Sequence, residues 1–177
     1  MDEHTIKEKI GKIRPQVIGV VITQRENEIN LCPINFQAVS TIYEKPPSVC
    51  IGLDNSNYTL ETILETKEFV YAYPSKNQLK DTIYCGTVSR HNVDKLNNTN
   101  FTFSPSKIIK PPILNNAVLN FECKLIHYIN LGQFTIVVGE IKEIYSSDKT
   151  TLDKIYSLGG QKYGILKDFE ILQEGRK

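Results

Sequence analysis

Short runs of β-branched and aromatic residues, separated by prolines and polar turns, most limit what this chain can fold into. Residues 17–23 form one such run, bounded before by Pro15 and after by the polar residues 24–28. Two more runs occupy residues 48–53 and 69–73. Runs of this length and composition are typical of buried β-strands. The core is therefore expected to be built mainly from strands.

The longest β signal is a pair of runs, residues 117–129 and 134–145. The residues between them, Asn-Leu-Gly-Gln, suit the loop of a β-hairpin. In the first run apolar residues alternate with mostly polar ones, which predicts one buried face. In the second run the alternation slips at Gly139, which predicts a bulge or a close approach at this position.

Helical signals are few. Ser56 suits an N-cap, and Leu60 and Ile63 follow at helical spacing, so a helix is expected to begin there. A second, shorter helix is expected between Leu79 and Gly86. Short helices inserted among antiparallel strands favour a mainly β (α+β) barrel over a doubly wound sheet. The glycine signatures of dinucleotide, triphosphate and serine-hydrolase sites are absent from the sequence.

Length and charge narrow the class of protein further. A chain of 177 residues is expected to form a single domain over residues 1–177. Its 21 Lys and Arg against 20 Asp and Glu give a net charge of +1, which argues against a dedicated nucleic-acid binder. No apolar stretch is long enough to cross a membrane, and no apolar signal region follows the N-terminus. A cytoplasmic protein with no membrane partner is expected.

Neither a metal site nor a catalytic residue can be assigned from the sequence. The four cysteines, Cys32, Cys50, Cys85 and Cys123, are too far apart for a metal knuckle or a redox dithiol. They are expected to be reduced, partly buried, small apolar side chains. The three histidines are also isolated from one another, so no acid–base pair can be recognised.

Two polar segments are candidate ligand-binding regions. Residues 30–40 are expected to form a long, nearly uncharged loop between the first two strands, whose amides and apolar side chains suit a planar heteroaromatic ligand. Residues 87–92 follow a helix end and offer hydroxyls, a guanidinium and backbone N–H groups to a phosphate or ribose. For each segment a plain surface loop remains the alternative.

Several short motifs occur in a distinctive order. They are I-x-P at residues 13–15, N-x-x-P at 30–33, V-S at 39–40, P-P at 46–47, E-F-V at 68–70, the segment CGTVSRHNVDK at 85–95 and LGGQKYG at 158–164. In this order, over roughly residues 12–165, the chain resembles the flavin reductase-like FMN-binding split-barrel family. Asn35 stands where the family usually has a serine, and Arg90 and His91 replace its glycine and arginine.

The resemblance implies a six-stranded Greek-key split β-barrel, a homodimer and one FMN bound near the subunit interface. It also implies an NAD(P)H-dependent flavin reductase, a flavoredoxin-like electron carrier or a ferric reductase. FMN carries its own redox chemistry, so the protein need only bind, orient and tune it. This agrees with the lack of a recognisable acid–base constellation.

The motifs and polar segments together nominate a cofactor-binding shell. Residues expected against the ring and ribityl chain are Asn30, Cys32, Pro33, Ile34, Asn35 and Phe36. Candidates for the phosphate are Asn55, Ser56, Thr59, Ser89 and Arg90. Tyr163 is expected to cover the ring or line the approach of the nicotinamide.

Three functions remain open from the sequence. The first is an FMN-dependent reductase that takes a hydride from NAD(P)H and passes electrons to free flavin, ferric iron or a partner protein. The second is an FMN-binding electron carrier without its own NAD(P)H site. The third is a barrel that binds single-stranded nucleic acid, and the near-neutral charge argues against it.

Overall fold

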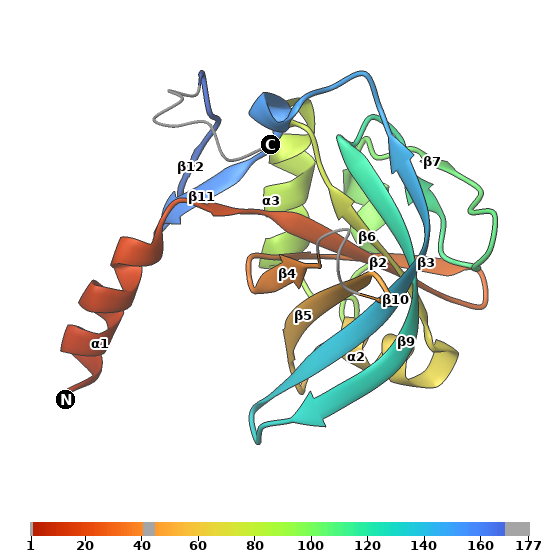
Figure 1. Cartoon of the computed structure of the whole chain (residues 1–177), viewed down its shortest axis with the longest axis horizontal. Helices are drawn as coiled ribbons and strands as arrows, with labels where there is room; N and C mark the ends of the chain where they lie inside the picture. The colour runs from red at the N-terminus through yellow and green to blue at the C-terminus, as the bar shows by residue number, and fades with distance from the viewer. Residues whose placement is uncertain (1, 41–44, 169–177) are drawn as a thin grey trace.

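Seven antiparallel strands pair into one curled sheet, in the order β3-β2-β6-β9-β10-β5-β4 (Figure 1). The computed structural model describes residues 2–40 and 45–168 of the chain. The sheet wraps around its own core as a half-barrel, with β3 and β4 at its two edges. Its strands are β2 (Gly19–Arg25), β3 (Glu28–Ile34), β4 (Gln37–Val39), β5 (Ser48–Asp54), β6 (Glu68–Tyr73), β9 (Leu119–Asn130) and β10 (Phe134–Ser146).

The remaining elements surround this sheet, and a smaller three-stranded sheet, β1-β11-β12, projects from it together with helix α1 (Figure 1). We call this projection (α1, η1, β1, β11 and β12) the arm. Its elements are α1 (Glu3–Ile10), η1 (Gly11–Ile13), β1 (Gln16–Val17), β11 (Tyr156–Gly159) and β12 (Lys162–Gly164). The others are α2 (Tyr58–Thr66), η2 (Lys76–Gln78), α3 (Leu79–Thr87), η3 (Lys95–Asn98), β7 (Phe103–Ser104), β8 (Ile113–Leu114) and η4 (Thr151–Asp153).

The mainly β split-barrel architecture expected from the sequence is confirmed. The three short runs and the long hairpin are all strands, while the short β4 adds a seventh strand to the six expected. The expectation of a long loop at residues 30–40 is wrong, because β3 continues to Ile34 and β4 begins at Gln37. Helix α1 is also an element that the sequence patterns did not predict. The single domain over residues 1–177 stays a prediction.

Helix α2 begins one residue later than expected. Its N-cap is Asn57, whose side chain accepts a hydrogen bond from the backbone N–H of Thr59 at 2.9 Å. Ser56 instead donates its hydroxyl to Asp54 at 2.6 Å. Serine and asparagine are comparable N-caps. Asn57 has the extended backbone conformation of an N-cap, so the helix begins after Asn57 rather than after Ser56.

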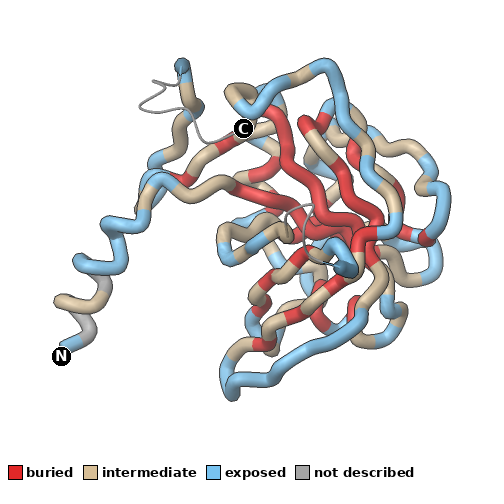
Figure 2. Tube along the Cα trace, in the orientation of Figure 1, coloured by how far each residue is buried: buried red, intermediate tan, exposed pale blue. Residues whose placement is uncertain are grey.

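The sheet is covered on both faces, and this explains the continuous apolar run in β2. Val21 belongs to the core inside the curl, whereas Val20 and Ile22 belong to a second core on the opposite face. All three side chains are fully buried, and Figure 2 shows the buried residues along the middle of the sheet. A strand that is covered on both faces does not need to alternate apolar and polar residues. No helix in the described part of the chain is both long and apolar enough to span a membrane.

Gly139 marks a bulge in the hairpin, as predicted. The register between β9 and β10 shifts between Val138 and Gly139. A Cβ at residue 139 would overlap the ring of Phe69 on β6. Glycine is therefore required at this position for the close approach of the Phe69 ring.

A buried carboxylate fixes the loop that precedes β8. Glu122 on β9 is fully buried and accepts backbone hydrogen bonds from Lys107 at 2.7 Å and Ile108 at 2.8 Å, as well as a hydrogen bond from the Tyr145 hydroxyl. Burial alone raises the pKa of Glu122, but these donors outweigh it and hold the pKa below its usual value. The charged form therefore stabilises the fold.

Replacing Glu122 with glutamine should lower the free energy of unfolding at pH 7 by about 2 kcal/mol or more, because a charged acceptor of several buried donors is lost. The pKa of Glu122 is depressed in the folded state, so its contribution is complete above the unfolded value of about 4.3 and is lost as the pH falls below it. Urea unfolding of both proteins between pH 3 and 7 tests this. The difference between them should shrink in acid.

The matched control is Glu143→Gln on neighbouring β10, where the carboxylate forms an exposed ion pair with Lys107 at 3.3 Å. Such pairs contribute little to stability, so a change within about 0.5 kcal/mol is expected. Equal destabilisation by the two variants, or a difference that grows in acid, would contradict the role assigned to Glu122.

Candidate functional site

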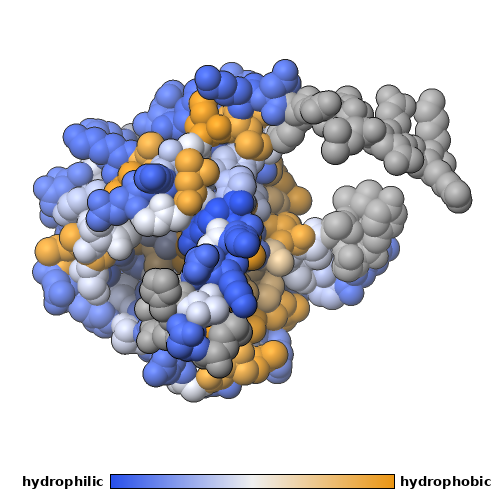
Figure 3. Space-filling model, turned by 90° about the vertical axis from the view of Figure 1, so that its left-hand side faces the viewer, coloured by the Kyte–Doolittle hydropathy of each residue, from blue (hydrophilic) through white to orange (hydrophobic). Residues whose placement is uncertain are grey.

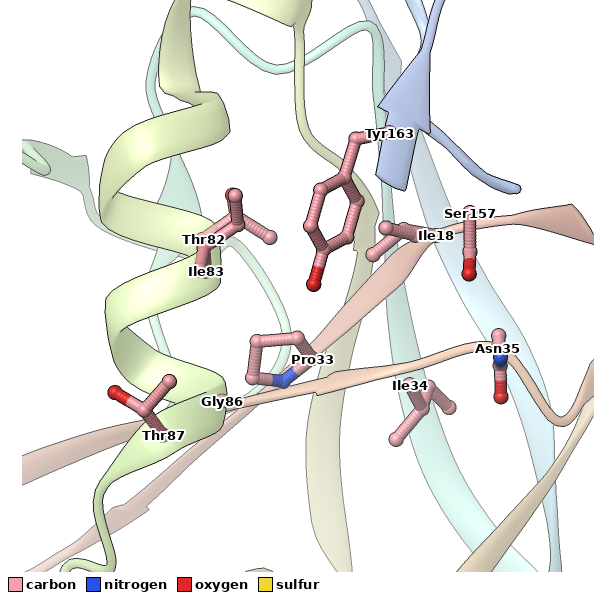
Figure 4. Close-up of a pocket in the computed structure, with 10 residues that line it drawn as sticks. All are labelled: Ile18, Pro33, Ile34, Asn35, Thr82, Ile83, Gly86, Thr87, Ser157 and Tyr163. Atoms are coloured by element: carbon pink, nitrogen blue, oxygen red, sulfur yellow. The ribbon is translucent and has the colours of Figure 1, made fainter. Parts of the chain in front are cut away.

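A pocket of about 250 Å³ lies between strand β3, helix α3 and the arm (Figure 4). Tyr163 from β12 extends towards the gap between α3 and β3, and Ser157 from β11 lies on the other side of Ile18 (Figure 4). The lining residues are Ile18, Pro33, Ile34, Asn35, Thr82, Ile83, Gly86, Thr87, Ser157 and Tyr163.

Pairing of β11 with β1 inside the arm, and a backbone bond from the arm to Ile18, bring Ser157 to the pocket. Residue 16 in β1 pairs with Ser157, and the backbone N–H of Ile18 donates to the carbonyl of Ile155 at 2.9 Å. The Arg14 guanidinium adds a hydrogen bond to the Ser157 hydroxyl at 2.5 Å. Because β2 begins directly after Ile18, these contacts hold the arm at the edge of the large sheet.

Three segments that are distant in the sequence meet in this pocket. Pro33 ends the N-x-x-P motif, Gly86 belongs to the CGTVSRHNVDK segment, and Tyr163 ends the L-G-G-x-x-Y motif. Of the nominated residues, the structure places Ile34 and Asn35 in the same lining. Four members of the predicted shell are therefore brought together.

Phe36 lies outside the pocket. Its ring covers Gly52 on β5, where a Cβ would overlap the ring, and it lies 5.9 Å from the ring of Phe134 between centroids. The side chain is 49% exposed. Phe36 therefore offers an aromatic surface on the β4–β5 side of the sheet.

Asn30 and Thr59 are directed into the interior. Both are buried, and the Asn30 amide donates to the Thr59 hydroxyl at 2.8 Å. This bond joins β3 to α2. The two residues are close together, but neither lines the pocket, so the structure gives them a packing role between strand and helix.

Cys32 lies beside the pocket without lining it. Its sulfur accepts a hydrogen bond from the Asn57 amide at 3.3 Å, which links β3 to the start of α2. Cys32, Cys85 and Cys123 are buried, as expected of small apolar side chains, and Cys50 is half-buried. Burial raises the pKa of Cys85 to about 11, so its thiol is protonated at neutral pH.

Asn55 and Ser56 lie near the tip of the long hairpin. The Asn55 amide donates to the carbonyl of Gly132 at 2.7 Å and accepts from the Thr135 hydroxyl at 2.7 Å. The Ser56 hydroxyl is bound to Asp54, and this bond holds the pKa of Asp54 below its usual value. The structure does not bring these phosphate candidates to the pocket.

Ser89 and Arg90 belong to a separate charged cluster. Arg90 forms an ion pair with Glu28 at 3.2 Å, and its Nε is buried without a hydrogen-bond partner among the described residues. His91 lies 3.6 Å from Glu61 and packs edge-on against the ring of Tyr58. Since Arg90 follows pocket residue Thr87 by three positions, at most about 10 Å of chain separates them.

The pocket itself is electrically neutral. None of its ten lining residues carries a charge at pH 7, and apolar surfaces come from Ile18, Ile34, Ile83 and the Pro33 ring. Within the described ranges, no three His, Cys, Asp or Glu side chains are grouped to hold a metal ion. The site is therefore suited to an uncharged group that has both apolar surface and hydrogen-bonding atoms.

Six lining residues were not nominated from the sequence. Gly86 and Thr87 stand inside or beside a quoted motif, and Ser157 directly precedes another, so motif proximity was an available signal. The other three residues stand in no quoted motif. The packing of α3 on β3 and the position of the arm bring them to the pocket. The unnominated residues are Ile18, Thr82, Ile83, Gly86, Thr87 and Ser157.

Solved structures of other proteins share this fold. Flavoredoxin from Methanosarcina acetivorans superposes with a TM-score of 0.78 at 24% sequence identity, covering 88% of this chain and 87% of its own. An FMN-binding protein from Thermus thermophilus, solved with bound p-hydroxybenzaldehyde, gives 0.79 at 19% identity, covering 90% and 91%. At these identities the likeness concerns the fold alone.

Sequence comparisons give the family. An uncharacterized protein from Aquifex aeolicus is 28% identical over 160 residues, which cover 87% of this chain and 80% of that protein. The sequence profile described as "Flavin reductase like domain" matches residues 12–162. This match includes Pro33 and Gly86 of the pocket and ends one residue before Tyr163. Because it covers most of the chain, the protein belongs to the flavin reductase-like family.

Proposed function

We propose that this protein binds FMN and acts as an NAD(P)H-dependent flavin reductase, passing electrons to free flavin, ferric iron or a partner protein. The observation that carries the proposal is the convergence of three distant motif segments, represented by Pro33, Gly86 and Tyr163, on one neutral pocket. When bound, FMN supplies the electron-transfer chemistry. The chain's residues then bind and orient the flavin and exclude water from it.

The residues present fit part of an FMN molecule. A volume of about 250 Å³ is below the range of pockets that enclose a drug-sized ligand, so the pocket would hold only part of a three-ring flavin. Arg90, three positions after Thr87, would bind the phosphate through its guanidinium, which now pairs with Glu28. Asn35 is proposed as a contact near the ring and Ser89 as one near the phosphate, with Phe36 as an apolar contact from the β4–β5 side.

A second copy of the chain completes the site in this proposal. The arm carries residues on the pocket wall but projects from the body, and it exposes Ile10, Ile13 and Leu158. In the side view of Figure 3, hydrophobic side chains gather along one margin of the body. Exposed apolar surface of this kind marks a protein interface. We therefore propose a homodimer in which the arm packs against the partner.

An electron carrier without an NAD(P)H site is the second candidate. It is favoured by the neutral lining, because no cation among the ten residues is available to the pyrophosphate of a dinucleotide. The structural likeness to a flavoredoxin agrees with such a role. The two candidates share FMN and differ in the source of the electrons.

The purified protein should copurify with, or take up, one FMN per chain and show the absorption bands of oxidised flavin. Anaerobic NADH or NADPH should bleach these bands if the protein is a reductase. Bleaching by dithionite but by neither nucleotide would support the electron carrier instead. A folded, colourless protein that leaves the fluorescence of added FMN unquenched would refute both.

Light scattering should give twice the chain mass for the FMN-loaded protein. Leu158→Asp on the arm should lower the dimer fraction and weaken FMN binding together, because a charge would be buried at the interface. The control is Ile108→Asp, an equally exposed position in the loop before β8. A strictly monomeric holoprotein, or dissociation by the control alone, would show that the arm is not the interface.

Arg90→Ala should weaken FMN binding about 10- to 150-fold, because a charge-assisted contact to the phosphate is lost. Riboflavin lacks the phosphate, so its affinity should change little. Glu28→Gln is the matched control: it removes the carboxylate that competes for Arg90, so FMN binding should tighten. Fluorescence titration measures all three. Equal weakening of both flavins, or no effect on FMN, would remove Arg90 from the phosphate site.

A further inference from the structure

A buried positive charge beside the pocket has no counter-ion in the described part of the chain. Lys95 in η3 is 5% exposed, and its Nζ donates to the carbonyls of Leu31 and Cys85, each at 2.9 Å. The adjacent carboxylate, Asp94, accepts instead from the backbone N–H of Leu96 at 3.1 Å. A neutral donor would satisfy two carbonyls as well, and burying an unpaired charge is unfavourable. Packing alone therefore does not explain the charge.

The groups around Lys95 leave its charge largely uncompensated. Burial lowers the pKa of Lys95, and the Arg90 guanidinium lowers it further, whereas the thiols of Cys32 and Cys85 act in the opposite direction. Burial raises the pKa of Cys85 to about 11, so this thiol is uncharged at neutral pH. Arg90 is itself paired with Glu28 at 3.2 Å. The net potential on this side of the pocket is therefore positive, although no lining residue is charged.

The ammonium lies close behind the pocket lining. The carbonyl carbon of Cys85 is bonded to the nitrogen of Gly86, which lines the pocket, so Nζ lies within about 5 Å of this nitrogen. The other acceptor, Leu31, precedes pocket residue Pro33 by two positions. A ligand that contacts Gly86 is then on the order of 10 Å from the charge. No direct contact is needed, because a Coulomb interaction acts over this distance.

Such a charge favours a ligand whose bound form is negative. The ring of oxidised FMN is uncharged. Reduction by a hydride, which brings two electrons and one proton, turns the ring into an anion unless a second proton follows. At about 10 Å and an effective dielectric constant of about 20, one positive charge favours the anion roughly 10-fold. A charge near the ring is one of the means by which a protein tunes a flavin.

We propose that Lys95 acts through its electric field on the flavin and holds the reduced, anionic form more tightly than the oxidised form. The proposal deepens the proposed function, on which it rests for a flavin ring in the pocket. A protein with this preference keeps its reduced flavin, so electrons leave the site and the flavin stays. FMN is then a resident cofactor rather than a released product, and the electron acceptor must come to it.

Sulfite tests the charge preference without an electron donor. It adds to the ring of oxidised flavin and leaves a negative charge there, and the loss of the flavin absorption band measures its binding to the FMN-loaded protein. Lys95→Gln keeps a hydrogen-bond donor and removes the charge, whereas Lys95→Arg keeps the charge. The matched control is Lys124→Gln, which removes an exposed charge on β9, three strands away from β3 in the sheet.

Lys95→Gln should weaken sulfite binding about 10-fold and change the affinity for oxidised FMN much less. Lys95→Arg and Lys124→Gln should bind sulfite as the unmodified protein does. Unchanged sulfite binding in Lys95→Gln, an equal loss in Lys124→Gln, or an equal loss in folded Lys95→Arg would each overturn the proposal.

The unmodified protein supplies a second test, which does not depend on the folding of any variant. In mildly alkaline buffer free reduced FMN is anionic, and anaerobic equilibrium dialysis should show that it binds about 10-fold more tightly than oxidised FMN. Equal binding of the two forms, or tighter binding of oxidised FMN, would refute the role of Lys95 alone. A folded protein that binds neither form would refute the flavoprotein assignment, and this role with it.

Discussion

A buried ammonium group joins the two walls on which the pocket depends. Lys95 is 5% exposed, and its Nζ donates to the carbonyls of Leu31 on β3 and Cys85 on α3, each at 2.9 Å. Burial lowers the pKa of Lys95, because the charged ammonium is less stable in the interior than in water. The carbonyl of Cys85 lies in the last turn of α3, where the helix dipole favours a cation. Gly86, directly after Cys85, and Pro33, two residues after Leu31, are therefore held close together, and a Cβ at residue 86 would lie 3.7 Å from the Pro33 ring.

The sheet and the arm contribute to the site in different ways. The sheet has a core on each face and holds β3 through its pairing with β2, so the wall at Pro33 and Ile34 is rigid. The arm has no buried core of comparable size, and its own strands pair only over short stretches, such as the two residue pairs between β1 and β11. Segments with few buried contacts open at a lower free energy than core strands do. The wall at Tyr163 is therefore the adaptable one.

Local patterns predicted the strands and the hairpin because those elements are encoded by neighbouring residues, and Gly139 even predicted the bulge. They failed at β3, where Asn30 and Pro33 suggested a loop. Pro33 is tolerated because β3 is an edge strand, and Asn30 is paired with Thr59 of a later helix, which no local pattern can reveal. The motifs predicted residues on the β3, α3 and arm walls of the pocket. They did not predict Thr82, because its place in the lining depends on how α3 packs.

Because the pocket is shared between a rigid wall and an adaptable one, binding and arm position are linked. A ligand that contacts both Thr82 and Tyr163 binds only when β12 lies over α3, so it stabilises that arrangement by RT ln(1 + [L]/Kd). In the same position the arm leaves Leu158 and Ile13 exposed. By thermodynamic reciprocity, packing of the arm against a partner would then increase the affinity of the pocket for its ligand. In the proposed dimer, assembly and ligand binding would therefore stabilise each other.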